Sequence, residues 1–365
     1  MNLLDRLLLR EIAWPLAVGL LAVLQLLVIF QLLQLNEIVF GSAVTLLDIA
    51  RITAALAPHF LVVAVPLAFM LGLQLGLGRL AADQEILALQ AAGIHPLRLY
   101  PVPLGLALVL AVLVAGLARY AEPWGLQQLN TVLNDAIKRN LQSGITPGQF
   151  NDALPRFMVY AEGIDGPNWK GVVIEDDVGD GAPLLLVAEA GRIEDTSGQA
   201  LAFRMFRGEI HRQDARGQTV ARFHEGTLLV GVQGPVSRKN RFADIDEATP
   251  QSQLPSRIRE LEAGGYVEES RRLRFEAVRR LAMPLACLAF ALFGVPTAIL
   301  GRGVRGSAYL LTLAGFVAFY ALQRASVTLA IRGVPALLAG FLPDLVIAAA
   351  GVALTVRLAH RGQRS

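Results

Sequence analysis

The sequence predicts a membrane α-helical protein with six transmembrane helices, arranged as three plus three, and an inserted all-β domain of jelly-roll-like type. Three observations carry this prediction. Of the 365 residues, 54% are hydrophobic and 17% are charged, whereas soluble domains are about 45–50% apolar. Apolar runs of membrane-crossing length occupy both parts of the chain that flank its middle, and the middle holds short β-forming stretches separated by turns.

Six apolar runs are long enough to cross a bilayer. Lipid offers no partner for backbone polar groups, so the crossing takes a helix of about 20 apolar residues. The runs cover residues 13–35, 52–78, 99–118, 281–300, 308–331 and 335–356. The first run is too long for the core of a signal peptide and no small-residue cleavage site follows it, so we expect it to remain as an anchor.

Arginines near the ends of these runs predict the orientation, because arginines in short segments resist translocation. The side of the N-terminus carries Arg6, Arg10, Arg79, Arg98, Arg302, Arg305, Arg357, Arg361 and Arg364. The short segments on the other side offer Arg51 and Arg332. We therefore expect both termini and the segment 79–98 in the cytoplasm, and the long middle segment on the opposite side of the membrane.

The middle segment, residues 122–271, is expected to form a separate domain between a first part (1–121) and a last part (272–365). Its stretches of β-formers are "RFMVYAE" from Arg156, "GVVIED" from Gly171, "LLLVAEA" from Leu184, "ALAFRMFRGEI" from Ala200 and "TVARFHEGTLLV" from Thr219. Turn-forming clusters separate them, a spacing typical of antiparallel sandwiches and jelly rolls. A charged helical pattern after this domain leads into the fourth apolar run.

The sequence carries no motif for chemistry of its own. No Walker A lysine motif and no G-x-S-x-G elbow occur, and "GRGVRG" at 301–306 lies between two apolar runs, where it predicts a tight turn and not a nucleotide site. The five histidines are scattered and Cys287 is alone, so we expect no metal and no disulfide. We predict that the chain is not an enzyme and binds no cofactor, and that a partner supplies the energy for any work.

The segment between the second and third runs, "RLAADQEILALQAAGIHPLRL", predicts a short amphipathic helix at about residues 82–93. Asp83 and Glu85 stand in its first turn, where acids suit the helix dipole. Ile86 and Leu89 share one face, and Gly93 offers a stop. Two interpretations remain open: a helix lying on the membrane surface, or a peg that inserts into a cytoplasmic motor.

Four stretches carry a resemblance to a known family. They are "LLDRLLLREI" near the N-terminus, "AVPLAFMLGLQLGLGRLAADQEILALQAAGI" at 64–94, "TPGQF" at 146–150 and "RRLAMPLACLAFALFGVPTAI" at 279–299. The chain resembles the LptF/LptG family of lipopolysaccharide export permeases nearly from end to end. The "TPGQF" stretch is slightly more similar to the F-type partner than to the G-type.

The resemblance implies a permease subunit of an ABC exporter in the inner membrane of Gram-negative bacteria. It implies pairing with a homologous permease around a cavity, and two copies of a separate ATPase that use ATP beneath it. It also implies that lipopolysaccharide passes to a bridge of periplasmic jelly-roll domains, of which the β-domain would be the first. The helix around Glu85 would be the coupling helix that docks on the ATPase. Nucleic acid is not an expected partner.

Candidate substrate residues follow from the phosphates of lipid A, which guanidinium groups bind well. Arg324 lies inside the fifth apolar run without an acid one turn away, and a charge there is costly unless it faces a partner or a wet cavity. Arg51 and Arg119 are further candidates, although anchoring at the interface explains them too. Gln31 and Gln34 stand where the family often carries basic residues.

A second function class remains an alternative. The chain would then be a proton-coupled secondary lipid transporter, or a membrane-embedded enzyme, with a periplasmic recognition domain. Such a transporter needs a relay of ionisable groups inside the membrane. Away from the ends of the apolar runs the sequence offers few acids for one, so we favour the ATP-driven exporter.

Overall fold

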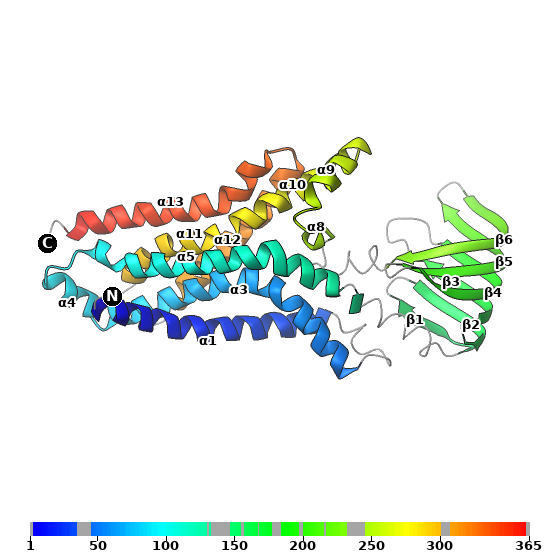
Figure 1. Ribbon diagram of the computed structural model, residues 1–365, viewed down its shortest axis with the longest axis horizontal. Helices are drawn as coiled ribbons and strands as arrows, with labels where there is room; N and C mark the ends of the chain where they lie inside the picture. The colour runs from blue at the N-terminus through cyan, green and yellow to red at the C-terminus, as the bar shows by residue number, and fades with distance from the viewer. Residues whose placement is uncertain are drawn as a thin grey trace. The chain divides into compact units, whose positions relative to one another are not determined.

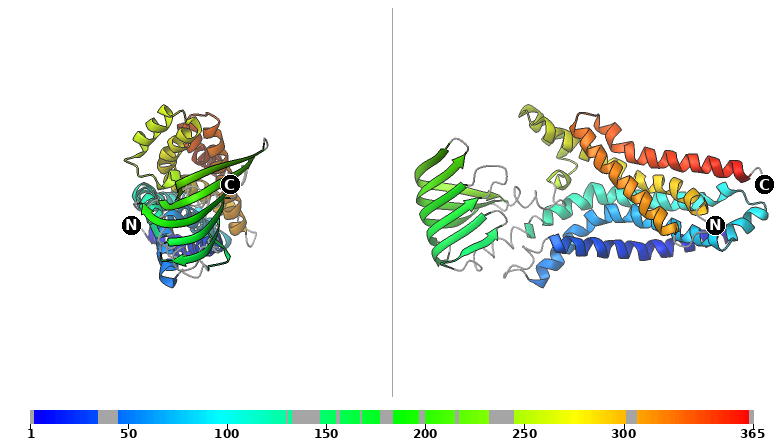
Figure 2. Two further views of the ribbon diagram at one scale, coloured as in Figure 1. Left: turned by 90° about the vertical axis from the view of Figure 1, so that its right-hand side faces the viewer. Right: turned by 180° about the vertical axis from the view of Figure 1, so that it is seen from behind.

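The computed structural model describes residues 3–34, 45–129, 131–132, 147–154, 157–166, 168–176, 184–196, 200–214, 217–231, 245–300 and 307–362. The chain divides into two compact units. The helical unit comprises residues 1–29, 57–124 and 249–365, and the sheet unit comprises residues 30–56 and 125–248. Both units are drawn in Figures 1 and 2.

Helices dominate the parts of the chain on either side of the strands. They are α1 (Leu3–Gln34), α3 (Leu46–Ala82), α4 (Glu85–Ala91), the 3-10 helix η1 (Pro96–Leu99), α5 (Pro101–Gly116), the π-helical segment η2 (Leu117–Ala121), α8 (Ile245–Ala248), α9 (Leu254–Ala263), α10 (Val267–Ala282), α11 (Leu285–Leu300), α12 (Ser307–Ile331) and α13 (Ala336–Gly362). Residues 122–129 continue the helix after η2.

Five helical stretches of the described chain are long and apolar enough to cross a membrane: Leu3–Ile29, Leu46–Ala82, Pro96–Leu129, Leu313–Ile331 and Ala336–Leu358. The helices α10 and α11 make a sixth when taken together, with a bend of 53° between them. The prediction of a six-span membrane protein is therefore confirmed at five to six spans. The bend was not predicted; it falls beside Pro284, whose missing N–H interrupts the helical hydrogen bonds.

The centre of the helical unit is α3. Of its apolar window, 72% is buried, against 11% for α1. Phe69, Met70, Leu73 and Leu77 of α3 belong to one large core cluster with Phe290 of α11. The outward faces of α1, α5, α12 and α13 keep many large apolar side chains exposed, as expected of helices whose solvent is lipid.

Two glycines let α3 approach α1 closely. A Cβ atom on Gly76 would lie 2.4 Å from the carbonyl oxygen of Glu11, and one on Gly72 would lie 2.9 Å from that of Ile12. Gly72 and Gly76 are four residues apart, so they share one face of α3. This is the small-residue spacing by which membrane helices bring their backbones into contact.

The sheet unit holds one six-stranded antiparallel sheet, so the inserted all-β domain is confirmed. Its strands follow the order β1-β2-β3-β4-β5-β6, a meander without crossovers among the described strands. They are β1 (Phe150–Leu154), β2 (Phe157–Asp165), β3 (Asn168–Asp176), β4 (Leu184–Thr196), β5 (Ala200–Asp214) and β6 (Gly217–Gly231). Figure 2 shows the sheet face-on, with strands twisted progressively from β1 to β6.

The pairing register gives the sheet one apolar face. Val159 pairs with Ile174, which pairs with Leu186, and Ala161 pairs with Val172 in the same way. All of these side chains are buried. Because side chains alternate between the two faces of a sheet, they form a continuous apolar stripe across β2, β3 and β4.

Candidate coupling helix and buried charge network

A left-handed residue separates α4 from the end of α3. Gln84 has φ 60°, and its N–H donates to the carbonyl of Ala81 at 3.3 Å. Few non-glycine residues adopt this conformation, which interrupts the helical backbone between α3 and α4. After α4, Gly93 is left-handed as well (φ 84°), and the N–H of Ile94 donates back to Leu89 at 3.0 Å. This is the glycine-terminated helix end that the sequence predicted.

One side of α4 packs into the core of the helical unit, and the other side is exposed. Ile86 is 1% exposed and belongs to the main core cluster, and Leu89 is partly buried. Asp83, Glu85 and Leu87 are exposed. Asp83 lies 3.7 Å from the Arg79 guanidinium, whereas Glu85 has no ion pair with any residue that the structure describes. The carboxylate at the first position of α4 is therefore available to a partner.

Bonds to neighbouring helices hold the segment that carries α4. Arg79 lies 3.3 Å from Glu11 of α1 at one end, and Arg98 lies 2.9 Å from Asp5 of α1 at the other. Such exposed pairs contribute little stability one by one. The hydroxyl groups of Tyr100 and Thr355 also lie in hydrogen-bond contact, which joins this segment to α13. The segment that carries α4 is therefore bonded to α1 and α13, in addition to its chain connections to α3 and α5.

Arg324 of α12 has a partner that the sequence analysis overlooked. Its Nε and Nη2 atoms donate to the hydroxyl oxygen of Tyr320 at 3.1 and 2.8 Å, and its guanidinium carbon lies 5.2 Å from the centre of that ring. Tyr320 stands one turn earlier and is not an acid, so a search for carboxylates missed it. Arg324 is nevertheless exposed.

The other candidate substrate residues lie on separate elements. Arg119 belongs to the π-helical segment η2, is exposed, and has its guanidinium carbon 5.9 Å from the centre of the Tyr120 ring. Arg51 is exposed near the start of α3. Gln31 and Gln34 lie in the last two turns of α1, and their side chains are outside the described part of the structure. The contacts described for these residues do not bring them to one site.

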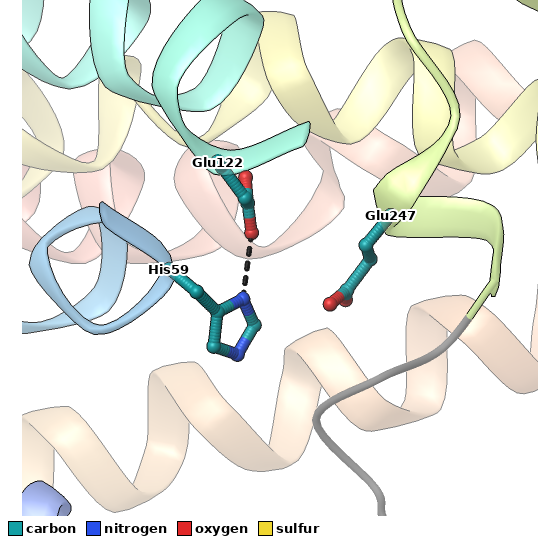
Figure 3. Close-up of side chains that lie close together, drawn as sticks. All are labelled: His59, Glu122 and Glu247. Atoms are coloured by element: carbon teal, nitrogen blue, oxygen red, sulfur yellow. Dashed lines mark hydrogen bonds and ion pairs between the residues drawn. The ribbon is translucent and has the colours of Figure 1, made fainter. Parts of the chain in front are cut away.

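The sequence analysis missed a chain of five buried polar side chains in the helical unit, which we call the buried charge network: His59, Glu122, Arg279, Glu276 and Arg280. Nδ1 of His59 lies 2.8 Å from Oε1 of Glu122, the contact drawn in Figure 3. Both Glu122 carboxylate oxygens accept from Nη2 of Arg279, at 3.1 and 3.2 Å. None of the five residues is more than 7% exposed.

Glu276 is the centre of the second half of this network. It accepts from Nε of Arg279 at 2.6 Å, from Nη2 of Arg279 at 3.0 Å and from Nε of Arg280 at 2.8 Å. The Nη2 atom of Arg280 also donates a hydrogen bond to the carbonyl of Thr249 at 2.8 Å. The two arginines balance the two glutamates in charge, which a buried cluster requires. The network fastens α10 to α3 and to the helix that follows η2.

Asp344 of α13 is a second feature that the sequence analysis passed over. It is 7% exposed in the middle of the apolar stretch "FLPDLVI". Its Oδ1 atom has no hydrogen-bond partner among the residues that the structure describes. An acid inside a membrane span is costly and usually serves a function. The signal was visible in the sequence as a single carboxylate within a long apolar run.

Fold and site together define a class: a multi-pass helical membrane protein with an antiparallel sheet inserted between its spans and a short acid-led helix between its second and third spans. The family model described as "Lipopolysaccharide export system permease LptF/LptG" matches residues 6–357. The chain belongs to this family, which confirms the resemblance found in the sequence.

Curated relatives carry the same family name. The lipopolysaccharide export system permease proteins LptF of Escherichia coli (strain K12) and of Shigella flexneri are each 28% identical to the chain over 139 residues. The match covers 37% of this chain and 38% of each relative.

Proposed function

We propose that the protein is the permease subunit of an ATP-driven exporter that extracts lipopolysaccharide from the inner membrane and passes it to a periplasmic bridge. Membership of the family supports this proposal. The observation that carries it is α4, a short helix fixed between two spans by Ile86 with the Glu85 carboxylate exposed and without a described partner. A chain without a nucleotide motif needs such a contact to receive work from a separate ATPase.

The arrangement that follows places both termini and α4 in the cytoplasm and the sheet unit in the periplasm. Two copies of a cytoplasmic ATPase would bind beneath a pair of homologous permeases, this chain being closer to the F-type. A cationic side chain of the ATPase would pair with Glu85, and its movement would act on α3 and α5 through the anchored helix. No cofactor is assigned to this chain.

Replacing Glu85 by Ala or Lys is expected to weaken association with the ATPase, or to uncouple hydrolysis from export. A charge-assisted hydrogen bond contributes about 1.5–3 kcal/mol, which corresponds to roughly 10- to 100-fold in affinity. Co-purification of the ATPase and ATP-dependent release of lipopolysaccharide from proteoliposomes measure the two effects. Glu269→Ala is the matched control, because Glu269 is an exposed acid in the first turn of α10. Normal association and export in both Glu85 variants would refute the role of this residue.

Arg324 is our first candidate for contact with the lipopolysaccharide phosphates, followed by Arg51, Arg119, Gln31 and Gln34. A photo-crosslinker at position 324 is expected to capture lipopolysaccharide in cells. Arg324→Glu should lower capture at neighbouring cavity positions without lowering the amount of protein, because it replaces a phosphate-binding cation by an anion. Arg332→Glu, a change of charge in the exposed turn after α12, is the control. Adducts to protein alone would assign Arg324 a structural role beside Tyr320.

Asp344 keeps the proton-coupled alternative worth testing, since a relay needs an acid inside the membrane. Under the proposed function, Asp344→Asn is expected to fold and to export at a rate within about twofold of the original protein, because asparagine has nearly the same shape and packing. Proteoliposomes that contain the ATPase and are given either ATP or a proton gradient distinguish the two mechanisms. Export driven by the gradient and abolished in Asp344→Asn would favour the transporter.

A further inference from the structure

Two adjoining pockets in the helical unit are lined by residues of α9, of α10 and of the turn between α12 and α13. One has a volume of about 310 Å³ and includes Glu262, Ser270, Arg271 and Arg274 in its lining. The other, of about 170 Å³, shares both arginines and extends along the turn from Ala330 to Ala336. The shared arginines make the two pockets one basic site, which we call the α10 pocket.

Arg271 is positioned on the turn between α12 and α13. Its Nη1 atom donates to the carbonyl of Ile331, the last residue of α12, at 3.0 Å. Its guanidinium also lies against Gly333, whose φ of 104° favours glycine. Among the residues that the structure describes, no other partner takes its remaining N–H groups. Arg271 therefore keeps donors for a ligand.

Arg274 stands one turn further along α10 and lines both pockets. It is paired with Glu262 of α9, and its side chain is 56% exposed. The lining thus carries two cations and one acid, a net positive charge. A guanidinium group presents a planar fork of donors that binds two phosphate oxygens at once.

We propose that the α10 pocket binds the phosphate of an anionic phospholipid headgroup. This ligand is separate from the exported cargo, and the proposal does not depend on what the protein exports. The phosphate would take donors from Arg271 and Arg274 and would compete with Glu262 for the latter. Anionic lipid headgroups bind in basic pockets between membrane helices on the cytoplasmic side, and the same pairing of guanidinium with phosphate applies to this pocket.

The surroundings of the pocket favour a lipid over a free phosphate ion. Large apolar side chains in and next to its lining are exposed: Val267 of the larger pocket at 52%, and Leu337 and Leu338, which follow Ala336 of the smaller pocket, at 63% and 65%. Tyr266 is 58% exposed beside them, and tyrosine is enriched where membranes meet water. A ligand with a charged head and apolar chains satisfies both parts of this surface.

The test uses the purified, delipidated full-length chain in detergent, titrated with dioleoylphosphatidylglycerol and followed by native mass spectrometry. Dioleoylphosphatidylcholine and inorganic phosphate are the comparison ligands, and neither the ATPase nor lipopolysaccharide is present. We expect phosphatidylglycerol to bind about tenfold more tightly than phosphatidylcholine, and the double variant R271Q/R274Q to lose that difference. Arg272→Gln is the matched control, because Arg272 lies next to Arg271 but outside the pocket, 3.2 Å from Glu268.

Glu262→Gln is expected to change the affinity for phosphatidylglycerol in the opposite direction to R271Q/R274Q. It removes the acid that competes for Arg274, so binding of phosphatidylglycerol is expected to strengthen, and this result does not depend on the folding of the double variant. Unchanged binding in both R271Q/R274Q and Glu262→Gln would overturn the proposal. An equal loss in Arg272→Gln would also overturn it, by showing attraction to surface charge in general. Full competition by inorganic phosphate would overturn the choice of a lipid.

Discussion

Replacing Glu276 by Ala is expected to lower the free energy of unfolding by about 3–5 kcal/mol, the cost of breaking a buried ion pair by removing one partner. Glu276 accepts three hydrogen bonds from Arg279 and Arg280. Without it, Arg279 and Arg280 remain buried and lose these three hydrogen bonds. Thermal unfolding of the purified protein in detergent, followed by loss of the monomer peak in size-exclusion chromatography, measures the effect.

Glu268→Ala is the control for this variant. Glu268 lies on the same helix and is paired with Arg272, but its side chain is 60% exposed. An exposed pair contributes about 0–1 kcal/mol, so this variant should unfold close to the original temperature. Equal and small losses in the two variants would show that the buried charges contribute no more than surface charges do.

Replacing Gly76 by Val is expected to destabilise the contact between α1 and α3 by about 3 kcal/mol, at the upper end of the cost of overpacking. The Cβ atom would meet the carbonyl oxygen of Glu11 at 2.4 Å and its carbon at 2.8 Å. These are backbone atoms, which cannot move aside as a flexible side chain would. Either α1 must shift along its whole length or the two helices must separate.

Gly105→Ala is the control for the glycine contact. Gly105 lies in α5, and apart from its chain neighbours and the backbone of its own helix, no atom of the described residues lies within 4 Å of the position that its Cβ would take. Alanine has a higher helix propensity than glycine, by roughly 1 kcal/mol, so this variant should unfold at the same or a higher temperature. A Gly76→Val protein as stable as the original would contradict the close approach of α1 and α3.

Much of the fold could be predicted because it depends on local patterns. The six apolar runs correspond to α1, α3, α5, α11, α12 and α13, and the five predicted strands correspond to β2 to β6. Strand β1 was missed, since the five residues Phe150–Leu154 show no apolar alternation. The sheet order and the bend at Pro284 were missed as well, because both depend on how segments pack and not on their composition.

The two parts of the candidate site, the α4 helix and the buried charge network, also differ in how far the sequence could predict them. The α4 helix could be predicted from its own residues, because acid, apolar face and terminal glycine stand within a dozen positions. The buried charge network joins His59 to Glu122 across 63 positions and Glu122 to Arg279 across 157. Sequence spacing does not encode such contacts. Only the local Glu276, Arg279 and Arg280 pattern, at three and four positions, could have indicated them.

The π-helical turn η2 determines how long the third span must be. Its wide turn holds one residue more than an α-helical turn would, and Glu122 follows it directly. Each residue of an α-helix advances about 100° around the axis, so loss of that residue would rotate Glu122 away from His59 and Arg279. A bilayer can accommodate a third span that is one residue shorter or longer. The contacts of Glu122 with His59 and Arg279 would not survive that change. Insertions and deletions should therefore be excluded from residues 117–121 more strictly than from the apolar stretch before them.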